Sequence, residues 1–357
     1  MENHEIVQFA EKVISSITND INNSIYSDPE ASLTVQWKRC EAFNASAISN
    51  SKPTEPPIHI IEINYGLVIS LYQDIDDYCN YLESGLDQEI FDYFQKDHSA
   101  IKLLPPSFEP IEYRKNMFIS ALTWVYFHEL AHLNQEHGYL LNKITNTFHY
   151  SKFEEFNLDK SQSLKGNIAN LHHTLELAAD FEAIKVCIAE LIRHFNNHNN
   201  ELKETIGTLV SGISCAVYKM HNLSMLDLKS EITGSHPSSI VRLEQILPQI
   251  WEHFDLLERH KLININMDRS ELVQMVDMNA RTAGFFWFRK RHIQPTDLVT
   301  FIHHGTINRA GGKEYLQSII NTWDAIKDEI NENLRNKDKA FSILEFSDEY
   351  RDLVFER

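Results

Sequence analysis

Several features that would assign the chain to a familiar class are missing. No Cys-x-x-Cys pair occurs, and the four cysteines (Cys40, Cys79, Cys187 and Cys215) are far apart. Such scattered thiols are typical of buried cysteines in a reducing compartment, not of a disulfide framework or a thiolate zinc site. The N-terminal residues lack the basic-then-apolar pattern of a secretory signal. The longest uncharged apolar run near the histidine motif described below, residues 117–127, is about half of what a membrane span needs. These absences predict a cytoplasmic protein that does not enter a membrane.

Positive charge is also scarce. The chain has 33 lysines and arginines against 51 aspartates and glutamates, which gives a formal net charge of −18. A surface this acidic repels phosphate backbones, so we expect no nucleic-acid partner. The short basic run at residues 289–292 is the one contrary signal, and we interpret it as a solvated helix end. The 43% hydrophobic content is that of an ordinary globular protein.

The hydrophobic pattern predicts a mostly helical α+β fold with a small N-terminal sheet packed on the helix that carries the histidine motif. Strands are expected at residues 33–37 and 58–64. Helices are expected at residues 5–25, 67–82, 88–94, 114–137, 171–194, 202–221, 270–278 and 313–336, with another that begins at Pro237. We divide the chain into an N-terminal lead-in (1–110), a catalytic core (111–255) and a helical C-terminal region (256–357), which could form one continuous domain.

The helix predicted at residues 114–137 is apolar on nearly all sides between Met117 and Phe127, so it should be buried. Gly138 follows it directly and is placed to cap its C-terminus. The next residues, 139–170, show no regular spacing and are predicted to be irregular.

The buried helix carries the motif His128-Glu129-Leu130-Ala131-His132. Side chains four residues apart share one helix face, so both imidazoles can reach one ion. Glu129 lies on the adjoining edge, where it can take a proton from an attacking water. Two histidines and a glutamate on a buried helix would be costly unless something coordinates them. The motif therefore predicts one Zn²⁺ per chain, which needs a third protein ligand if a position is to stay open for water.

Glu176 is the predicted third ligand. It begins the segment Glu176-Leu177-Ala178-Ala179-Asp180, in which one helix face can present Glu176 to zinc and Asp180 to a histidine ligand. A hydrogen bond from that histidine to Asp180 would fix the tautomer of its imidazole. The rival ligands are His172 and His173, one turn earlier, and Glu182, about 120° around the helix from Glu176.

A third histidine ten residues after His128 would indicate the metzincin pattern, but Gly138 occupies that position. His137 is one residue short, and we interpret it as a helix-end residue. Further along, His236-Pro237 precedes a predicted helix whose second turn holds Arg242. His236 and Arg242 could both reach one point and stabilise the oxyanion formed in peptide hydrolysis. The alternative for this segment is an ordinary surface helix start.

Taken in order, the histidine motif, the segment 176–180 and the His-Pro with Arg242 resemble the gluzincins of the HtpX and CAAX-prenyl-protease kind. Those proteins commonly lie in membranes. The segment Ala121–His132, with His137 following, looks more like the active-site helix of the Lit-type phage-exclusion peptidases of bacteria. The matching blocks span about residues 118–246. The resemblance implies a cytoplasmic endopeptidase that cleaves elongation factor Tu once a phage component signals infection. The last ~100 residues exceed what that family needs, which leaves substrate and trigger open.

The sequence thus predicts a zinc endopeptidase in which Glu129 is the general base and His236 and Arg242 bind the oxyanion. The expected partners are a protein substrate and a phage-derived or host activator. Two other classes compete with this interpretation. One is a non-catalytic metal-binding sensor, which would have no use for a base beside the two histidines. The other is a membrane-associated quality-control metallopeptidase, which the absence of an apolar span disfavours.

An open zinc site would damage the cell that makes it, so the active site needs a gate. The irregular segment 139–170 contains aromatic side chains that could lie over a cleft: Phe148, His149, Tyr150, Phe153 and Phe156. We expect this segment either to cover the cleft and move when an activator binds, or to be a passive surface excursion.

Overall fold

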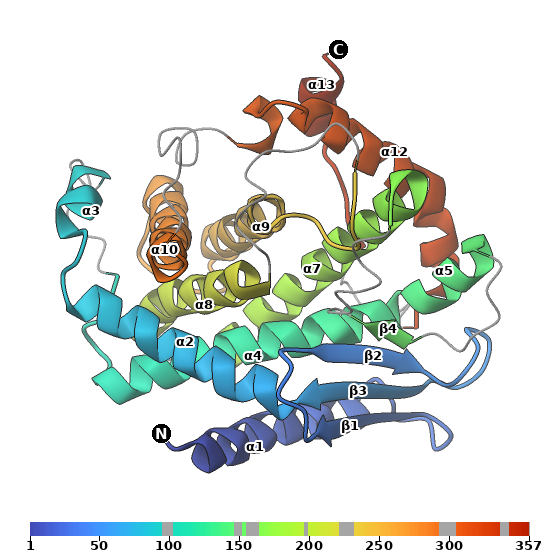
Figure 1. Cartoon of the computed structure of the whole chain (residues 1–357), viewed down its shortest axis with the longest axis horizontal. Coiled ribbons are helices and arrows are strands. Elements are labelled where there is room, and N and C mark those ends of the chain that lie inside the picture. Colours follow the sequence, from blue (N-terminus) through green and yellow to red (C-terminus); the bar gives the residue numbers. More distant parts are fainter. Residues whose placement is uncertain are drawn as a thin grey trace.

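A long buried helix, α4, runs through the middle of the molecule, with the sheet on one side and α7 and α8 on another (Figure 1). The computed structural model describes residues 1–94, 103–145, 152–154, 164–195, 199–220, 232–292, 305–335 and 343–356. The elements in these ranges are α1 (Asn3–Asn22), β1 (Ser32–Lys38), β2 (Ala45–Ser49), β3 (Ile58–Asn64), α2 (Tyr65–Glu83), α3 (Gln88–Phe94), α4 (Pro110–Asn134), α5 (His137–Thr145), β4 (Lys152–Glu154), α7 (Gly166–Phe195), α8 (Asn199–Met220), α9 (Ser239–Arg259), α10 (Arg269–Lys290), η1 (Thr306–Asn308), α12 (Gly312–Asn333) and α13 (Asp348–Phe355).

The sheet has the strand order β1-β3-β2-β4. β1 runs parallel to β3, and β2 runs antiparallel to both β3 and β4. Along β3, His59, Ile61 and Ile63 are buried while the residues between them are more exposed, as period-two alternation requires. The faces of β2 and β3 contact α4. The prediction of a mostly helical α+β fold with a small sheet packed on this helix is confirmed, although β2 and β4 were not foreseen.

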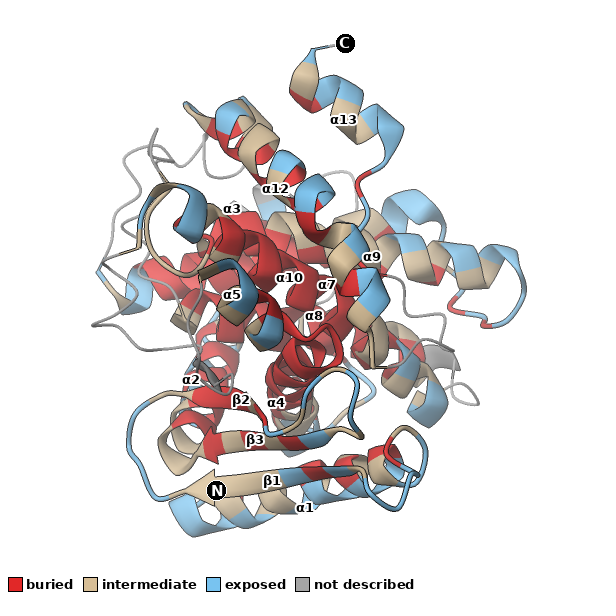
Figure 2. Cartoon of the chain, turned by 90° about the vertical axis from the view of Figure 1, so that its right-hand side faces the viewer, coloured by how far each residue is buried: buried red, intermediate tan, exposed pale blue. Residues whose placement is uncertain are grey.

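α4 is buried on almost every side, as its composition predicts (Figure 2). It begins at Pro110, whose missing N–H is no loss in the first turn. It ends at Asn134, three residues earlier than expected, and Gly138 is not its cap, because that glycine lies within α5. Glu136 takes the left-handed backbone conformation instead, with φ of 51°. Its buried carboxylate is bonded to the Arg335 guanidinium, and this contact holds a non-glycine residue there.

The segment 139–170 is more regular than predicted. It contains most of α5 and the edge strand β4, and α7 begins at Gly166, so the expectation of irregular structure is wrong in these places. The backbone of Gly166 has φ of 59°, which glycine adopts without strain. Of the aromatic residues of the hypothetical lid, Phe153 belongs to β4, and the others (Phe148, His149, Tyr150 and Phe156) lie outside the described part of the chain. The lid stays a prediction.

The C-terminal helices pack on the same core as the rest. Buried apolar side chains from α1 to α13 form one cluster, in which α10 contacts α8 and α9 and α12 contacts α7. Arg335 adds a second link, because it donates to the backbone oxygens of Lys52 and Pro53 in the β2–β3 loop as well as to Glu136. The division at residues 110 and 255 stays a prediction.

Two smaller expectations need correction or completion. α9 begins at Ser239 and Pro237 precedes it; Ser238 is the N-cap, whose hydroxyl accepts from the backbone N–H of Val241. Two residues of the basic run at the end of α10 form ion pairs: Arg289 pairs with Asp87, and Lys290 pairs with acidic residues of α2. No helix in the described ranges is long and apolar enough to cross a membrane.

Two buried histidines in the fold predict acid sensitivity. His59, which is bonded to the Tyr26 hydroxyl, has its pKa lowered to about 3 by burial and by Arg335. Burial also lowers the pKa of His173 to about 3. Unfolded histidines have a pKa near 6.5, so only the unfolded state takes up these protons as the pH falls from about 6.5 towards 3. The free energy of unfolding should therefore be highest above pH 6.5 and fall by about 1.4 kcal/mol per pH unit for each such histidine.

Urea unfolding at pH 7.5, 6 and 5 measures this dependence. In His59→Gln, the free energy of unfolding should fall less steeply with decreasing pH, by about 1.4 kcal/mol per pH unit. His4→Gln, a change at an exposed position, is the matched control and should leave the slope as it is. Equal slopes in all three proteins would show that His59 does not stay neutral in the fold.

Candidate metal centre

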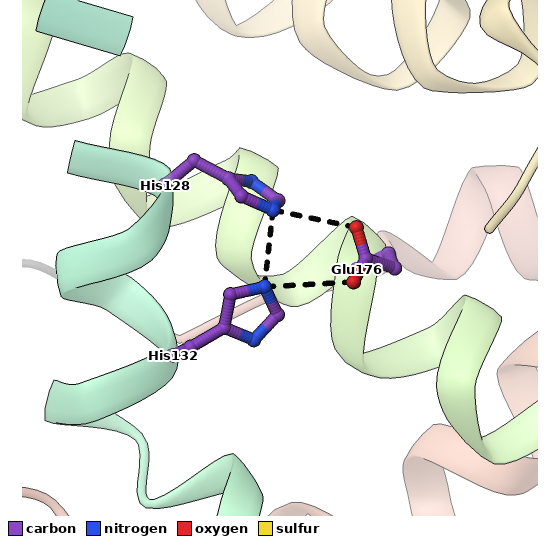
Figure 3. A group of neighbouring side chains, drawn as sticks. All are labelled: His128, His132 and Glu176. Carbon is purple, nitrogen blue, oxygen red and sulfur yellow. Dashed lines mark hydrogen bonds and ion pairs between the residues drawn. The ribbon is translucent and has the colours of Figure 1, made fainter. Parts of the chain in front are cut away.

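Two helices bring the predicted metal-binding residues together. His128 and His132 lie one turn apart on α4, and Glu176 faces them from α7 (Figure 3). The two Nε2 atoms are 3.0 Å apart. The Glu176 carboxylate lies 3.3 Å from His128 Nε2 and 3.5 Å from His132 Nε2. All three side chains are buried, and in the described residues they form the group of His, Cys, Asp and Glu that could hold a metal ion.

The spacing of these donors fits a tetrahedral ion. With zinc–nitrogen and zinc–oxygen bonds of about 2.0–2.1 Å, the ligand atoms of a tetrahedral site lie about 3.3 Å from one another. The two Nε2 atoms are 3.0 Å apart, Glu176 Oε2 lies 3.3 Å from His128 Nε2, and the other oxygen, Oε1, lies 3.5 Å from His132 Nε2, all close to that value. Two imidazoles and one carboxylate also form the donor set of a catalytic zinc site that keeps its fourth position open. The donor set therefore fits zinc, and one ligand atom from each of the three residues lies within 4.8 Å of the others.

Asp180 holds His128 in the orientation that a ligand needs. Its Oδ1 lies 2.9 Å from His128 Nδ1, so that nitrogen carries the proton and Nε2 keeps its lone pair for a metal. Asp180 also receives two hydrogen bonds of 2.7 Å from the Arg242 guanidinium. Burial raises the pKa of Asp180, but Arg242 and the hydrogen bond from His128 lower it by more than burial raises it. The net result is a pKa below the usual 3.8. The carboxylate is therefore ionised at neutral pH.

A second chain of buried groups orients His132. His132 Nδ1 lies 2.7 Å from His137 Nδ1, and His137 Nε2 lies 3.1 Å from the Gln135 side-chain oxygen. The Gln135 amide donates to Glu182 over 2.7 Å. One donor order satisfies every contact: His132 donates to His137, His137 to Gln135, and Gln135 to Glu182. This order leaves the Nε2 lone pair of His132 directed at Glu176.

Burial sets the protonation of this second chain. Burial, together with nearby His128 and His137, lowers the pKa of His132 well below 6.5. Burial lowers the pKa of His137 to about 3 and raises the pKa of Glu182 to about 7. Both histidines are therefore neutral at physiological pH, which is the state in which imidazole binds a metal.

The remaining predicted residues lie around this group. Glu129 is fully buried on α4, next to His128. His236 Nε2 lies 3.5 Å from Glu176 Oε1, and its Nδ1 contacts the Ser235 hydroxyl over 2.7 Å. Arg242 is fully buried and lies 3.8 Å from Glu176 as well as against Asp180. The segment that holds His236 and Arg242 thus lies against the metal group, while their oxyanion role stays a prediction.

The rival ligands have other partners. His173 Nδ1 contacts the Tyr315 hydroxyl over 3.1 Å, and Glu182 accepts from Asn134 and Gln135. His137 contacts His132 Nδ1 through its own Nδ1 and the Gln135 side-chain oxygen through its Nε2. Neither these three residues nor His172 is part of the metal group found in the described residues. Glu176 is therefore the better candidate for the third ligand.

Sequence reasoning missed the support that Trp124 and Gln135 give. Trp124 lies one turn before His128, fully buried, with its ring 5.7 Å from that imidazole and 5.2 Å from the Arg242 guanidinium. The four-residue spacing from His128 was a usable signal for Trp124. The role of Gln135 depends on the turn after α4, and no local pattern indicated that turn.

Residues 105–255 match the model of the family described as Peptidase U49. The matched stretch contains α4, α5, α7 and α8 and nearly all of α9, and thus every residue of the candidate centre. The match supports a peptidase family and agrees with the resemblance to Lit-type peptidases. Searches of curated proteins and of solved structures give no match.

Proposed function

We propose that this chain is a zinc-dependent endopeptidase of the gluzincin type. The observation that carries the proposal is the convergence of His128, His132 and Glu176, which are buried within about 3.5 Å of one another and have Glu129 beside them on the same helix. The convergence falls inside the stretch that matches a peptidase family. A carboxylate directly after the first histidine suits hydrolysis and has no use in a site that only binds metal.

The chain's own residues supply the proton transfers and the orientation. When bound, zinc would polarise the scissile carbonyl and acidify the attacking water. Glu129 takes a proton from that water and returns it to the leaving amine. Asp180 and Arg242 hold His128 in its ligand tautomer, and His137 does the same for His132. His236 is the residue best placed to donate to the oxyanion, since it lies beside Glu176 and is the most exposed of these groups.

Burial of the centre bears on control. His128, Glu129 and Glu176 expose none of their surface. A peptide therefore reaches them only after the chain around them moves, which fits a peptidase that waits for a trigger. Following the Lit-type resemblance, we propose a cytoplasmic protein substrate, with elongation factor Tu as the first to test, and a role in defence against phage. A phage-derived component is then the activator to test first.

Comparison of protein cleavage in bacterial lysates tests the proposed activity. Lysates with the wild-type chain and with Glu129→Gln are analysed by mass spectrometry for new peptide termini, with and without phage infection. The proposal expects termini in elongation factor Tu or another protein that depend on Glu129. The same termini in both lysates would instead support the competing class, a metal-binding sensor without catalysis.

His236→Ala should lower turnover by about 10²–10³ and leave KM and zinc content nearly unchanged, because loss of one oxyanion donor typically has an effect of this size. Steady-state kinetics on the substrate found in the lysate, together with metal analysis, provides the measurement. Equal loss of zinc and of turnover would indicate that His236 supports the metal group and does not bind the oxyanion.

A further inference from the structure

A pocket of about 500 Å³ lies between α1, α4, α7 and α8, and no residue of the candidate metal centre lines it. Its volume is within the range of about 300–1,000 Å³ that is typical of sites for small ligands. The lining is mainly apolar, with side chains from all four helices: Phe9, Val13, Ile17, Ile119, Leu191 and Leu209. A ligand here would be enclosed largely by hydrocarbon.

The pocket is also the place where α4 lacks cover. From Met117 to Asn134 every residue of α4 is buried except Ile119, which is partly exposed and lines the pocket. An apolar side chain open to water in a helix that is otherwise enclosed gives a ligand apolar surface to bury. The hydroxyls of Ser120 and Thr123, which also line the pocket, already donate to backbone oxygens of α4 and need no hydrogen bond from a ligand.

The charged groups of the pocket favour an anion. Lys12 and Arg193 line it together with one carboxylate, Glu190. Glu190 is already engaged by Arg193 at 2.6 Å, and Arg193 also reaches Asp20 on α1 at 3.3 Å. Lys12 is exposed and has no ion pair with any described residue. The charged group that remains for a ligand is therefore the Lys12 ammonium, although the chain as a whole has a net charge of −18.

We propose that this pocket binds an amphipathic monoanion, a single-chain alkyl carboxylate. The alkyl chain lies against Ile119 and the apolar side chains of α1, α7 and α8, and the carboxylate pairs with Lys12 at the mouth. The site needs no metal and no catalysis, so its test is independent of the proposed peptidase function.

Calorimetric titration of the full-length chain with dodecanoate, kept below its micelle concentration, tests the site. Binding should be one to one, and decanoate, which is two methylenes shorter, should bind about fifteenfold more weakly, since each buried methylene changes affinity about fourfold. Val13→Trp, which fills the pocket, should weaken binding at least tenfold. Ser16→Trp, at an exposed position on the rim, should weaken binding in the same way, so the test does not depend on Val13→Trp alone. Circular dichroism checks that both variants fold.

Charge variants test the proposed headgroup. Lys12→Glu should weaken dodecanoate binding about fivefold, whereas Lys203→Glu, a matched change on α8 outside the lining, should leave it within twofold. Dodecyltrimethylammonium should bind the wild-type chain more weakly than dodecanoate does. Three results would overturn the proposal: no binding of dodecanoate, unchanged binding in both tryptophan variants, or equal affinity for the cationic and anionic amphiphiles.

Discussion

Glu129→Gln is expected to lower peptide-bond cleavage by about 10³ while the chain keeps its zinc. General-base catalysis typically contributes about 10²–10⁴ in rate, and glutamine has no basic group with which to take the proton. The side chain is fully buried on α4, and its amide replacement has almost the same volume, so the fold should tolerate the change. Cleavage assays on the identified substrate, paired with metal analysis, give both quantities.

Glu176→Gln provides the contrast to this variant. It makes the same chemical change on α7, at a residue that faces both imidazoles. It should lose zinc and activity together, because an amide is a weaker ligand than a carboxylate. If Glu129→Gln lost the zinc and Glu176→Gln kept it, the two glutamates would have exchanged their proposed roles.

Arg242→Met should lower the free energy of unfolding of the metal-free chain by about 3–5 kcal/mol. Removing one partner of a buried ion pair leaves the other charge unsolvated, and losses of this size are typical. The Arg242 guanidinium makes two bonds of 2.7 Å to Asp180, and both side chains are buried. Urea unfolding in the presence of a chelator measures the loss without a contribution from zinc.

The double variant Asp180→Asn/Arg242→Met tests whether the pair is the cause. Removing both charges should recover part of the stability, so the two single changes should not add. Asp180→Asn alone should weaken zinc binding about 10–100-fold, because the hydrogen bond from His128 Nδ1 then goes to a neutral amide oxygen instead of a carboxylate. If Arg242→Met left stability unchanged and lowered only turnover, Arg242 would be a direct oxyanion donor, as the sequence first suggested.

The parts of the site that lie on one helix could be predicted from the sequence. The spacing of His128 and His132 is a local property of α4, and so is that of Glu176 and Asp180 on α7. The ends of the helices could be predicted less well. Gly138 looked like the cap of α4, but Glu136 makes the turn, and the contact that holds it comes from Arg335, 199 positions away in the sequence. No local pattern carries that information.

The surroundings of the metal group illustrate the same limit. His137 read as a helix-end histidine because its partner could not be known; the turn after α4 folds it back onto His132. The oxyanion role of Arg242 stays a prediction. What the sequence did not indicate is that its guanidinium donates to Asp180 and lies over the Trp124 ring. Side-chain direction depends on packing between helices, which residue spacing does not determine.

Zinc content is the most direct test of the proposed metal centre. The purified chain, loaded with zinc and then dialysed, is analysed by plasma mass spectrometry beside two alanine variants of buried histidines. We predict one zinc in the wild-type chain, none in His128→Ala, and one in His173→Ala, whose histidine contacts Tyr315 and lies outside the metal group. A wild-type chain without zinc, or a His128→Ala chain that keeps it, would contradict a zinc site formed by His128, His132 and Glu176.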